Sequence, residues 1–324
     1  MNKQNLVSII IPTYNRSHLI SDTLDSIAAQ TYTNWECLII DDHSVDDTEA
    51  LIKTYTEKDS RFQFFKRPHD RPKGANSCRN FGFELSKGNY INWFDSDDIM
   101  LPNKIELQVQ ALQNHTQAPY CICQSFWFDK DKNLNLGMRS TSIDSKNRFE
   151  DYILQKIVWL TTVPLWRRQF IETNNLRFDE SLHQSQEYDF HIRALVIDEN
   201  YITVNKPLVK LIKHNSSISS NLYKDNLKIN SHIKVKKGVL KNYHQRLSRS
   251  TKLKLYESFT LMFKDLLVIR KYNSAYKLLI VQVQMLSYLK ISSYKKWFFL
   301  VQLMLAYITY RIFGKGYSLI KPLN

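Results

Sequence analysis

Short apolar runs alternate with helical patterns through the first third of the chain. The apolar runs are rich in β-branched and aromatic residues and have the length of strands, at residues 7–12, 37–40, 62–65 and 90–94. Apolar residues recur at helical spacing in the segments around them, which predicts helices over 17–30, 46–56, 76–86 and 102–112. Strands that alternate with helices imply βαβ units, so we predict an α/β fold with a mostly parallel sheet flanked by helices.

Polar clusters follow three of the predicted strands, and each begins where its strand ends. The clusters are Thr13-Tyr14-Asn15-Arg16, Asp41-Asp42 and Asp95-Ser96-Asp97-Asp98. Ligands of such sheets bind beyond the carboxyl ends of the strands. The sequence therefore predicts that all three clusters line one crevice.

The third cluster places three carboxylates within four residues. Like charges at this distance repel and raise one another's pKa values unless a cation lies between them. Asp95, Asp97 and Asp98 therefore indicate a hard divalent ion, Mg²⁺ or Mn²⁺, whose coordination substrate phosphates would complete. A solvated acidic turn is the alternative interpretation.

The other clusters offer groups that suit a nucleotide. Asp42 could accept hydrogen bonds from a base or a ribose, although an Asp pair also suits the cap of the next helix. Tyr14 could stack on a base or simply pack. Arg16 and Arg79 could contact a diphosphate, because guanidinium groups match phosphate oxygens, or could be ordinary surface charges.

Taken in order, these segments resemble the family 2 glycosyltransferases with the GT-A fold. The resemblance is carried by VSIIIPTYNR (7–16), LIIDDHS (38–44), CRNFG (78–82) and WFDSDD (93–98), and it extends over roughly residues 5–218. It implies a Rossmann-like GT-A domain at 1–220, with a nucleotide-sugar-binding half at 1–112 and an acceptor half at 113–220. Residues 221–324 would follow as a separate helical region.

The resemblance also implies roles for individual residues, with Asp95 and Asp97 forming the DXD motif. Donor contacts would come from Pro12, Thr13, Tyr14, Arg16, Asp42, Arg79 and Asp95. The metal ligands would be Asp97, Asp98 and His214, although a lone histidine is more often structural. The donor would be a nucleotide-diphospho-sugar, with uridine as the base that the family commonly uses.

The segment QEYDFHIR at 186–193 resembles the part of the family that carries the catalytic carboxylate. Many members have Glu-Asp where this chain has Gln186-Glu187, so the match places Glu187 at the base position and leaves Asp189 as the alternative. An inverting transfer needs one carboxylate to take the proton of the attacking hydroxyl. A surface ion pair between Glu187 and Arg193 is the competing interpretation.

Residues before this segment correspond to the place where the family lines its acceptor pocket. Trp159, Thr161 and Trp166 are therefore candidates for acceptor contacts, because aromatic rings can stack on a sugar face. Core packing competes with this role for at least one of the tryptophans.

The net charge of +14 belongs to the end of the chain. Residues 221–324 contain 20 Lys and Arg against 3 Asp and Glu, and their apolar residues follow helical periods. Basic residues mixed with aromatic ones are typical of helices at a membrane surface, so we predict peripheral binding to the inner face of the cell membrane. Packing on the catalytic domain is the alternative, and nucleic-acid binding is not expected.

Other features exclude several protein classes. The longest apolar stretch, 297–310, is too short for a spanning helix, and no signal peptide is visible. Four cysteines are too few for a disulfide scaffold, which favours a cytoplasmic protein.

The combined prediction is a metal-dependent, inverting hexosyl- or N-acetylhexosaminyltransferase. It would move a sugar to a hydroxyl of a glycan or lipid-linked saccharide in surface polysaccharide biosynthesis. Two alternatives stay open. One is a sugar nucleotidyltransferase, although the Thr13–Arg16 cluster lacks the glycines expected of its phosphate loop. The other is a non-catalytic protein that binds membrane or nucleic acid through its basic end.

Overall fold

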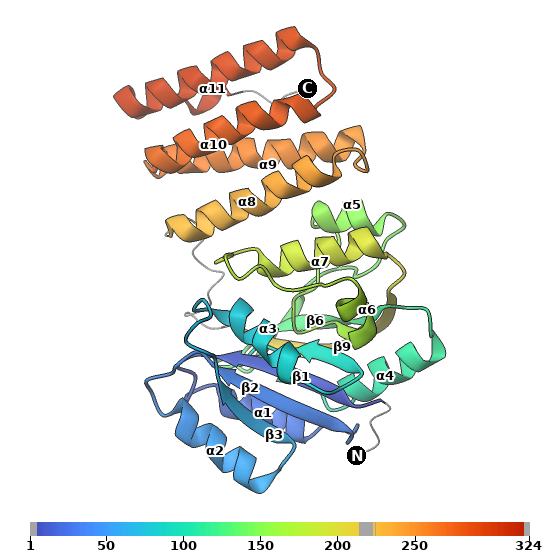
Figure 1. The fold of residues 1–324 in the computed structure, drawn as a ribbon. Coiled ribbons are helices and arrows are strands. Elements are labelled where there is room, and N and C mark those ends of the chain that lie inside the picture. Colours follow the sequence, from blue (N-terminus) through green and yellow to red (C-terminus); the bar gives the residue numbers. More distant parts are fainter. Residues whose placement is uncertain (1–4, 214–222, 224, 321–324) are drawn as a thin grey trace. The chain divides into compact units, whose positions relative to one another are not determined.

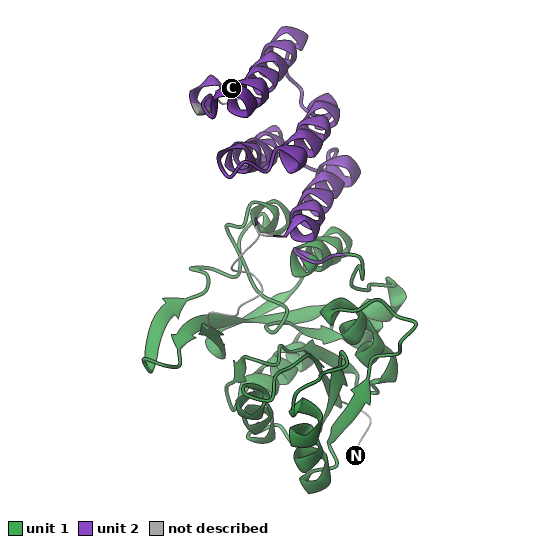
Figure 2. Ribbon diagram, turned by 90° about the vertical axis from the view of Figure 1, so that its left-hand side faces the viewer, with its two compact units in different colours: residues 1–181, 186–217 green, residues 182–185, 218–324 purple. Residues whose placement is uncertain are grey.

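The structure is a computed structural model that describes residues 5–213, 223 and 225–320. The chain forms two compact units, shown in green and purple in Figure 2. The first comprises Met1–Ser181 and Gln186–Ser217, and the second comprises Leu182–Ser185 and Ile218–Asn324. The boundary expected at residue 220 lies outside the described residues.

Four parallel strands form the first half of the sheet in the first unit. Their order is β3-β2-β1-β4. These strands are β1 (Val7–Thr13), β2 (Trp35–Asp41), β3 (Phe62–Lys66) and β4 (Tyr90–Trp93). The helices of this half are α1 (Ile20–Ala28), α2 (Thr48–Lys58), α3 (Ala75–Leu85) and, after β4, α4 (Lys104–Asn114). The predicted alternation of strands and helices is therefore confirmed.

The second half of the sheet is mixed, so the parallel arrangement does not extend through it. Within the described residues the sheet has nine strands, and β4 is followed by β8, β6, β9 and β5, while β7 pairs with the last residues of β6. Only β6 and β9 are parallel here, whereas β8 runs antiparallel to both of its neighbours. A short turn joins β6 to β7, which requires that pair to be antiparallel. The strands are β5 (Ile99–Met100), β6 (Tyr120–Asp129), β7 (Leu134–Met138), β8 (Leu165–Arg167) and β9 (Ile202–Lys213).

Three further helices, α5 (Arg148–Ile153), α6 (Arg168–Thr173) and α7 (Gln186–Ile197), complete the first unit. The central strands β1 and β2 are buried along their whole length, because α3 covers one face of the sheet while α1 and α2 cover the other (Figure 1). Gly82 allows α3 to approach β1 closely: a Cβ atom there would lie 2.4 Å from Ile10 Cγ2. This close packing holds α3, and with it Arg79, against the sheet.

Four α-helices make up most of the described part of the second unit: α8 (Asn226–Tyr243), α9 (Arg249–Val268), α10 (Tyr272–Met285) and α11 (Ser293–Phe313). Side chains cap three of their amino ends, since Asp225, Ser248 and Ser292 accept hydrogen bonds from backbone N–H groups two or three residues further on. The predicted helical C-terminal region is therefore present. No helix of the described residues is long and apolar enough to cross a membrane.

Candidate active site at the carboxyl edge of the sheet

The three polar clusters meet at the carboxyl edge of the parallel strands. Thr13 and Asp41 are partners in the register of β1 and β2, and the backbone N–H of Asp42 donates to the carbonyl oxygen of Thr13 over 2.8 Å. Arg16 Nη2 lies 3.7 Å from an Asp97 oxygen, which joins the first cluster to the third. The convergence expected from the strand order is therefore confirmed, whereas the roles of the residues stay predictions.

Asp42 is fixed by a partner that the sequence did not reveal. Arg67, just after β3, places its Nε 2.5 Å from Asp42 Oδ1, and both side chains are buried. Arg67 also donates to the carbonyl oxygens of Pro68 and Arg71. Because a buried carboxylate is costly without a cation, this pair holds Asp42 in a defined position beside Thr13.

The loops after β1 and β2 are locked together. Asn15 has a left-handed φ of 52°, its N–H donates to Ser44 Oγ, and its side-chain oxygen accepts from the N–H of Val45. Asp41 accepts hydrogen bonds from Ser44, so its carboxylate shapes this loop and does not cap α2. Neighbouring Tyr14 keeps 40% of its surface exposed, and Lys73 Nζ lies over its ring, 4.1 Å from the centroid.

Two arginines balance two of the carboxylates after β4. Arg79, buried on α3, places Nη2 2.7 Å from Asp95 Oδ1, and Arg16 faces Asp97. Asp98 lies deeper and accepts a hydrogen bond from the N–H of Ile212 on β9. Burial, with the nearby charges of Asp97 and Asp95, raises the pKa of Asp98 well above its usual range. Asp98 is thus turned toward the backbone of β9.

The donor atoms at this edge suit a hard divalent cation. The side chains of Asp95 and Asp97 remain 31% and 22% exposed, and carboxylate oxygens are the ligands that Mg²⁺ and Mn²⁺ prefer. No group of three or more His, Cys, Asp or Glu within the described ranges is arranged to hold a metal ion. A divalent ion bound at this edge would take one or two carboxylates from the protein and its other ligands from substrate phosphates. His214, the third expected ligand, lies outside the described residues.

Glu187, in the first turn of α7, has the properties of a general base. Burial raises its pKa to about 7, the charge of Asp95 adds to that effect, and Arg79 and Arg139 oppose it. The hydroxyl of Thr161 lies 3.5 Å from Glu187 Oε2. A carboxylate with a pKa near the working pH can take a proton and release it again. Arg139, directly after β7, was not anticipated from the sequence.

Asp189, the alternative candidate for the base, forms an ion pair with an arginine of the same helix. Arg193 places Nε 2.9 Å and Nη2 2.7 Å from Asp189 Oδ2, and it also donates to the carbonyl oxygen of Arg177. The ion pair that was considered for Glu187 is therefore made by Asp189. This leaves Glu187 as the carboxylate of α7 that lies near the Asp95–Arg79 pair.

Helix α3 fixes the segment that leads toward α7. Asn80 exchanges hydrogen bonds of 2.9 Å with the backbone N–H and carbonyl oxygen of Phe178. Glu180 accepts hydrogen bonds from Ser77 and Asn80, and Asn76 donates to the carbonyl oxygen of Asp179. Asn76, Asn80 and Glu180 therefore hold this segment against α3. Their contacts join positions about a hundred residues apart, which no local pattern could indicate.

The structure corrects the acceptor contacts expected of Trp159, Thr161 and Trp166. Each is only 1% exposed, so none offers a surface to a sugar here. The Trp166 ring lies 4.2 Å from that of Tyr120, between centroids, and it packs edge-on against Phe190 at 5.4 Å. Both tryptophans belong to an aromatic core beneath the site, which is the competing interpretation.

We expect Trp166→Ala to lower the free energy of unfolding by roughly 3–5 kcal/mol, because it leaves a large cavity in this core. Denaturant unfolding of the purified protein measures the change. Trp297→Ala is the matched control, because Trp297 is 62% exposed and its loss should change stability by less than about 0.5 kcal/mol. Equal stability of the two variants would contradict the assignment of Trp166 to the core.

Comparison with known proteins identifies the family. The model of glycosyl transferase family 2 matches residues 8–174, a segment that contains all but the first residue of β1, the Asp95–Asp98 cluster and β8. The chain belongs to this family.

Two similar proteins come from Methanocaldococcus jannaschii and Escherichia coli. An uncharacterized glycosyltransferase of Methanocaldococcus jannaschii is 28% identical over 207 residues, which cover 63% of this chain and 70% of the relative. The Escherichia coli UDP-Glc:alpha-D-GlcNAc-diphosphoundecaprenol beta-1,3-glucosyltransferase WfgD is 40% identical over 116 residues, which cover 36% of this chain and 44% of WfgD.

The fold also has a solved counterpart. The crystal structure of S. aureus TarS in complex with UDP-GlcNAc superposes with a TM-score of 0.68 at 15% identity. The superposition covers 98% of this chain and 89% of that one. The family match and this likeness together confirm the predicted GT-A fold and the helical region that follows it.

Proposed function

We propose that this family 2 protein transfers a sugar from a UDP-sugar to a hydroxyl of a glycan or lipid-linked saccharide, with inversion at the anomeric carbon. The observation that carries the proposal is the position of Glu187. This carboxylate, whose pKa is about 7, lies close enough to the Asp95–Arg79 pair to sense the charge of Asp95. The proposed base and the residues proposed to bind phosphate would thereby act at one edge of the sheet.

The proposed donor site rests on the geometry around β1, β2 and α3. Tyr14 would stack on the base, Asp42 would accept its hydrogen bonds, and Arg79 would face the diphosphate. The names of similar proteins favour uridine, since TarS was crystallised with UDP-GlcNAc and WfgD is named for UDP-Glc. The name of WfgD also motivates a diphospholipid-linked acceptor for this chain.

In the proposed reaction Glu187 takes the proton of the acceptor hydroxyl as its oxygen attacks the anomeric carbon. The new glycosidic bond forms while the bond from that carbon to the diphosphate oxygen breaks, and UDP leaves. A single displacement inverts the anomeric configuration. Asp97 and Asp95 would hold Mg²⁺ or Mn²⁺, which when bound neutralises charge on the leaving diphosphate. Thr161 would orient Glu187.

The products of transfer test this proposal. The protein would be incubated with UDP-Glc or UDP-GlcNAc, Mn²⁺ and a GlcNAc-diphospholipid, and the products followed by UDP release and NMR. We expect one UDP for each new linkage, and a β linkage from the α-configured donor. An α linkage would overturn inversion, and transfer only from donors with another base would overturn the uridine assignment.

Arg139→Gln is expected to shift the pH dependence of the reaction. Arg139 lowers the pKa of Glu187, so its removal should raise that pKa above about 7. Glu187 must be ionised to act as a base, and the acidic limb of the kcat/KM profile should therefore move to higher pH. Lys53→Gln, which removes an exposed positive charge on α2, should leave the profile unchanged. An unshifted profile for Arg139→Gln would contradict the assignment of the acidic limb to Glu187.

A further inference from the structure

Helix α11 exposes a stripe of apolar side chains along its length. At about 100° per residue, these exposed apolar residues of α11 fall on one face of the helix. Their exposed fractions are far above those of core residues: Tyr294 72%, Trp297 62%, Phe298 47%, Met304 48%, Leu305 48%, Ile308 50% and Ile312 64%. We call this set the α11 stripe.

The opposite face of α11 anchors the helix to the unit. Phe299, Leu303 and Ala306 are buried there, and the Phe299 ring lies 5.9 Å from that of Tyr256 on α9. The stripe is therefore not a frayed end, because the helix is fixed by one face and exposes the other. On the neighbouring helix α10, Tyr276, Ile280 and Val283 are also exposed at helical spacing, and the Tyr276 ring lies 5.9 Å from that of Tyr307 on α11.

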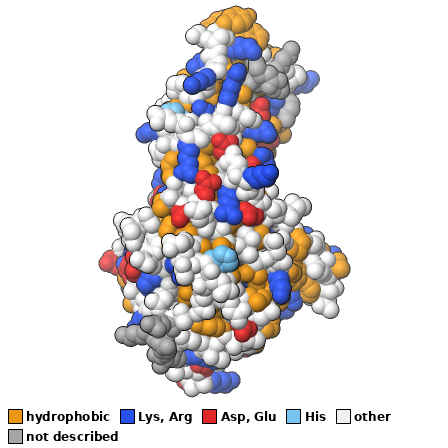
Figure 3. Space-filling model, turned by 90° about the vertical axis from the view of Figure 1, so that its right-hand side faces the viewer, with side chains coloured by type: hydrophobic (Ala, Val, Ile, Leu, Met, Phe, Trp, Pro, Cys, Tyr) orange, Lys and Arg blue, Asp and Glu red, His pale blue; other side chains and the backbone are white. Residues whose placement is uncertain are grey.

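The surroundings of the stripe are positively charged. No Asp or Glu follows Asp265 in the sequence. Lys295 lies in the first turn of α11 and Arg311 in its last turn, and Lys290 precedes the helix. In Figure 3, orange apolar side chains gather at the end of the helical unit with blue Lys and Arg side chains nearby. This combination favours a partner that is apolar beneath an anionic surface.

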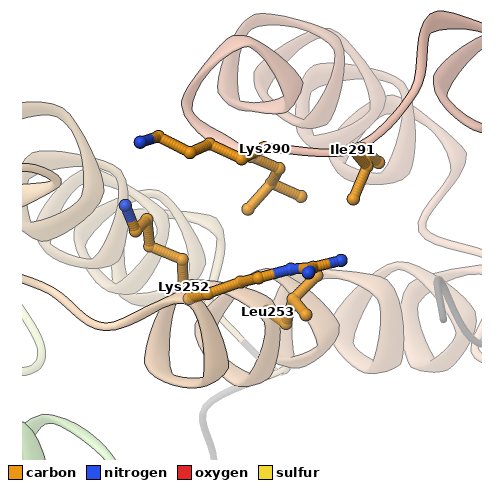
Figure 4. Close-up of a pocket in the computed structure, with 6 residues that line it drawn as sticks. Lys252, Leu253, Lys290 and Ile291 are labelled. Atoms are coloured by element: carbon orange, nitrogen blue, oxygen red, sulfur yellow. The ribbon is translucent and has the colours of Figure 1, made fainter.

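A basic pocket lies beside the amino end of α11. Three cationic and three aliphatic side chains line it: Arg249, Lys252, Leu253, Leu289, Lys290 and Ile291. The amino groups of Lys252 and Lys290 point to the same side (Figure 4). Across the described part of the chain, no carboxylate lies within 4 Å of a charged nitrogen of Arg249, Lys252 or Lys290. Such a pocket suits a phosphate group with an apolar stem.

We propose that the α11 stripe docks on an anionic lipid bilayer, with the helix lying in the interface and the basic pocket facing lipid phosphates. A second copy of the chain is a poorer partner. A two-fold interface through this face would bring two regions without acidic residues against each other, and like charges would repel. The tyrosine and tryptophan near the amino end suit the headgroup level, where aromatic side chains with a polar tip are favoured.

The full chain would be tested by co-sedimentation with vesicles of phosphatidylcholine alone and of phosphatidylcholine mixed with equal parts of phosphatidylglycerol. We expect strong binding to the mixed vesicles, weak binding to the neutral ones, and a decrease with added salt. Equal binding to both kinds of vesicle, or no binding to either, would overturn the proposal.

Two sets of variants test the α11 stripe and the basic pocket separately. Serine at Trp297, Ile308 and Ile312 should weaken binding to the mixed vesicles at least tenfold. Serine at Val45, Leu134 and Leu227, which are also exposed but lie outside the stripe, is the matched control and should leave binding unchanged. Glutamine at Lys252 and Lys290 should weaken binding to mixed vesicles by about fivefold for each charge removed.

Sedimentation velocity of the same variants tests whether a second copy of the chain binds the α11 stripe. A dimer of the unchanged protein that dissociates when the stripe is altered would show a self-interface and overturn the proposal. A monomer in all cases would support it. Sugar transfer is measured separately, so a failure of this surface does not bear on the active site.

Discussion

Glu187→Gln is expected to reduce the rate of sugar transfer by about 10²–10⁴-fold and to leave the affinity for a UDP-sugar nearly unchanged. The amide keeps the size of the side chain but cannot take the proton of the acceptor hydroxyl. Burial and the charge of Asp95 give this carboxyl its pKa of about 7, which is why the loss should be large. Single-turnover kinetics measure the rate, and calorimetry measures donor binding.

Asp189→Asn is the control for this prediction. Asp189 belongs to the same helix but is engaged by Arg193, so its replacement should affect stability more than turnover. Near-normal transfer by Glu187→Gln, together with a large loss in Asp189→Asn, would move the role of the base to Asp189. The same pattern would remove the main argument for the proposed reaction.

Asp97→Ala is expected to weaken UDP binding in the presence of Mn²⁺ by roughly a hundredfold, and to have little effect when EDTA is present. Asp97 is a carboxylate with 22% of its side chain exposed, opposite Arg16, and an accessible carboxylate suits a cation that bridges to phosphate. Calorimetric titration of UDP under both conditions measures the change. A metal-dependent affinity equal to that of the unchanged protein would contradict the role of Asp97.

Glu84→Ala provides the matched control for Asp97→Ala. It also removes a carboxylate from an ion pair with an arginine, since Glu84 Oε2 lies 2.6 Å from Arg71 Nη2, but on the exposed side of α3. UDP affinity in this variant should be unchanged with and without metal. A similar loss in both variants would indicate a general effect of charge and not a metal site.

The first half of the fold could be predicted because its signals are local. Each strand of β1–β4 is an apolar run, and each polar cluster follows directly in the sequence. The parallel order then brings Thr13, Asp42 and Asp97 to one edge. The second half could not be predicted in this way, because β8 pairs with β4 and β6, which lie far from it in the sequence.

The site residues that the sequence missed act through distant partners. Arg67 reaches Asp42 across 25 positions, and Arg139 acts on Glu187 from the end of β7. Neither has a motif of its own. Trp159 and Trp166, in contrast, were assigned a role that they do not have. An aromatic residue near a site can stack on a sugar or pack in the core, and only its burial in the structure distinguishes these two roles. The exposed face of α11 likewise could not be predicted, because the sequence does not show which side of the helix packs against the rest of the unit.

Thermal stabilisation by sugar nucleotides tests the central claim most directly. The unchanged protein would be melted with UDP-, GDP-, dTDP- and CMP-sugars, each in the presence of Mn²⁺ and of EDTA. A ligand at a hundred times its Kd should add about 2.7 kcal/mol to the free energy of unfolding, a clear rise in Tm. We predict a rise with UDP-sugars and Mn²⁺ that EDTA abolishes. No rise with any of the four classes would contradict a nucleotide-sugar site at the carboxyl edge of the sheet.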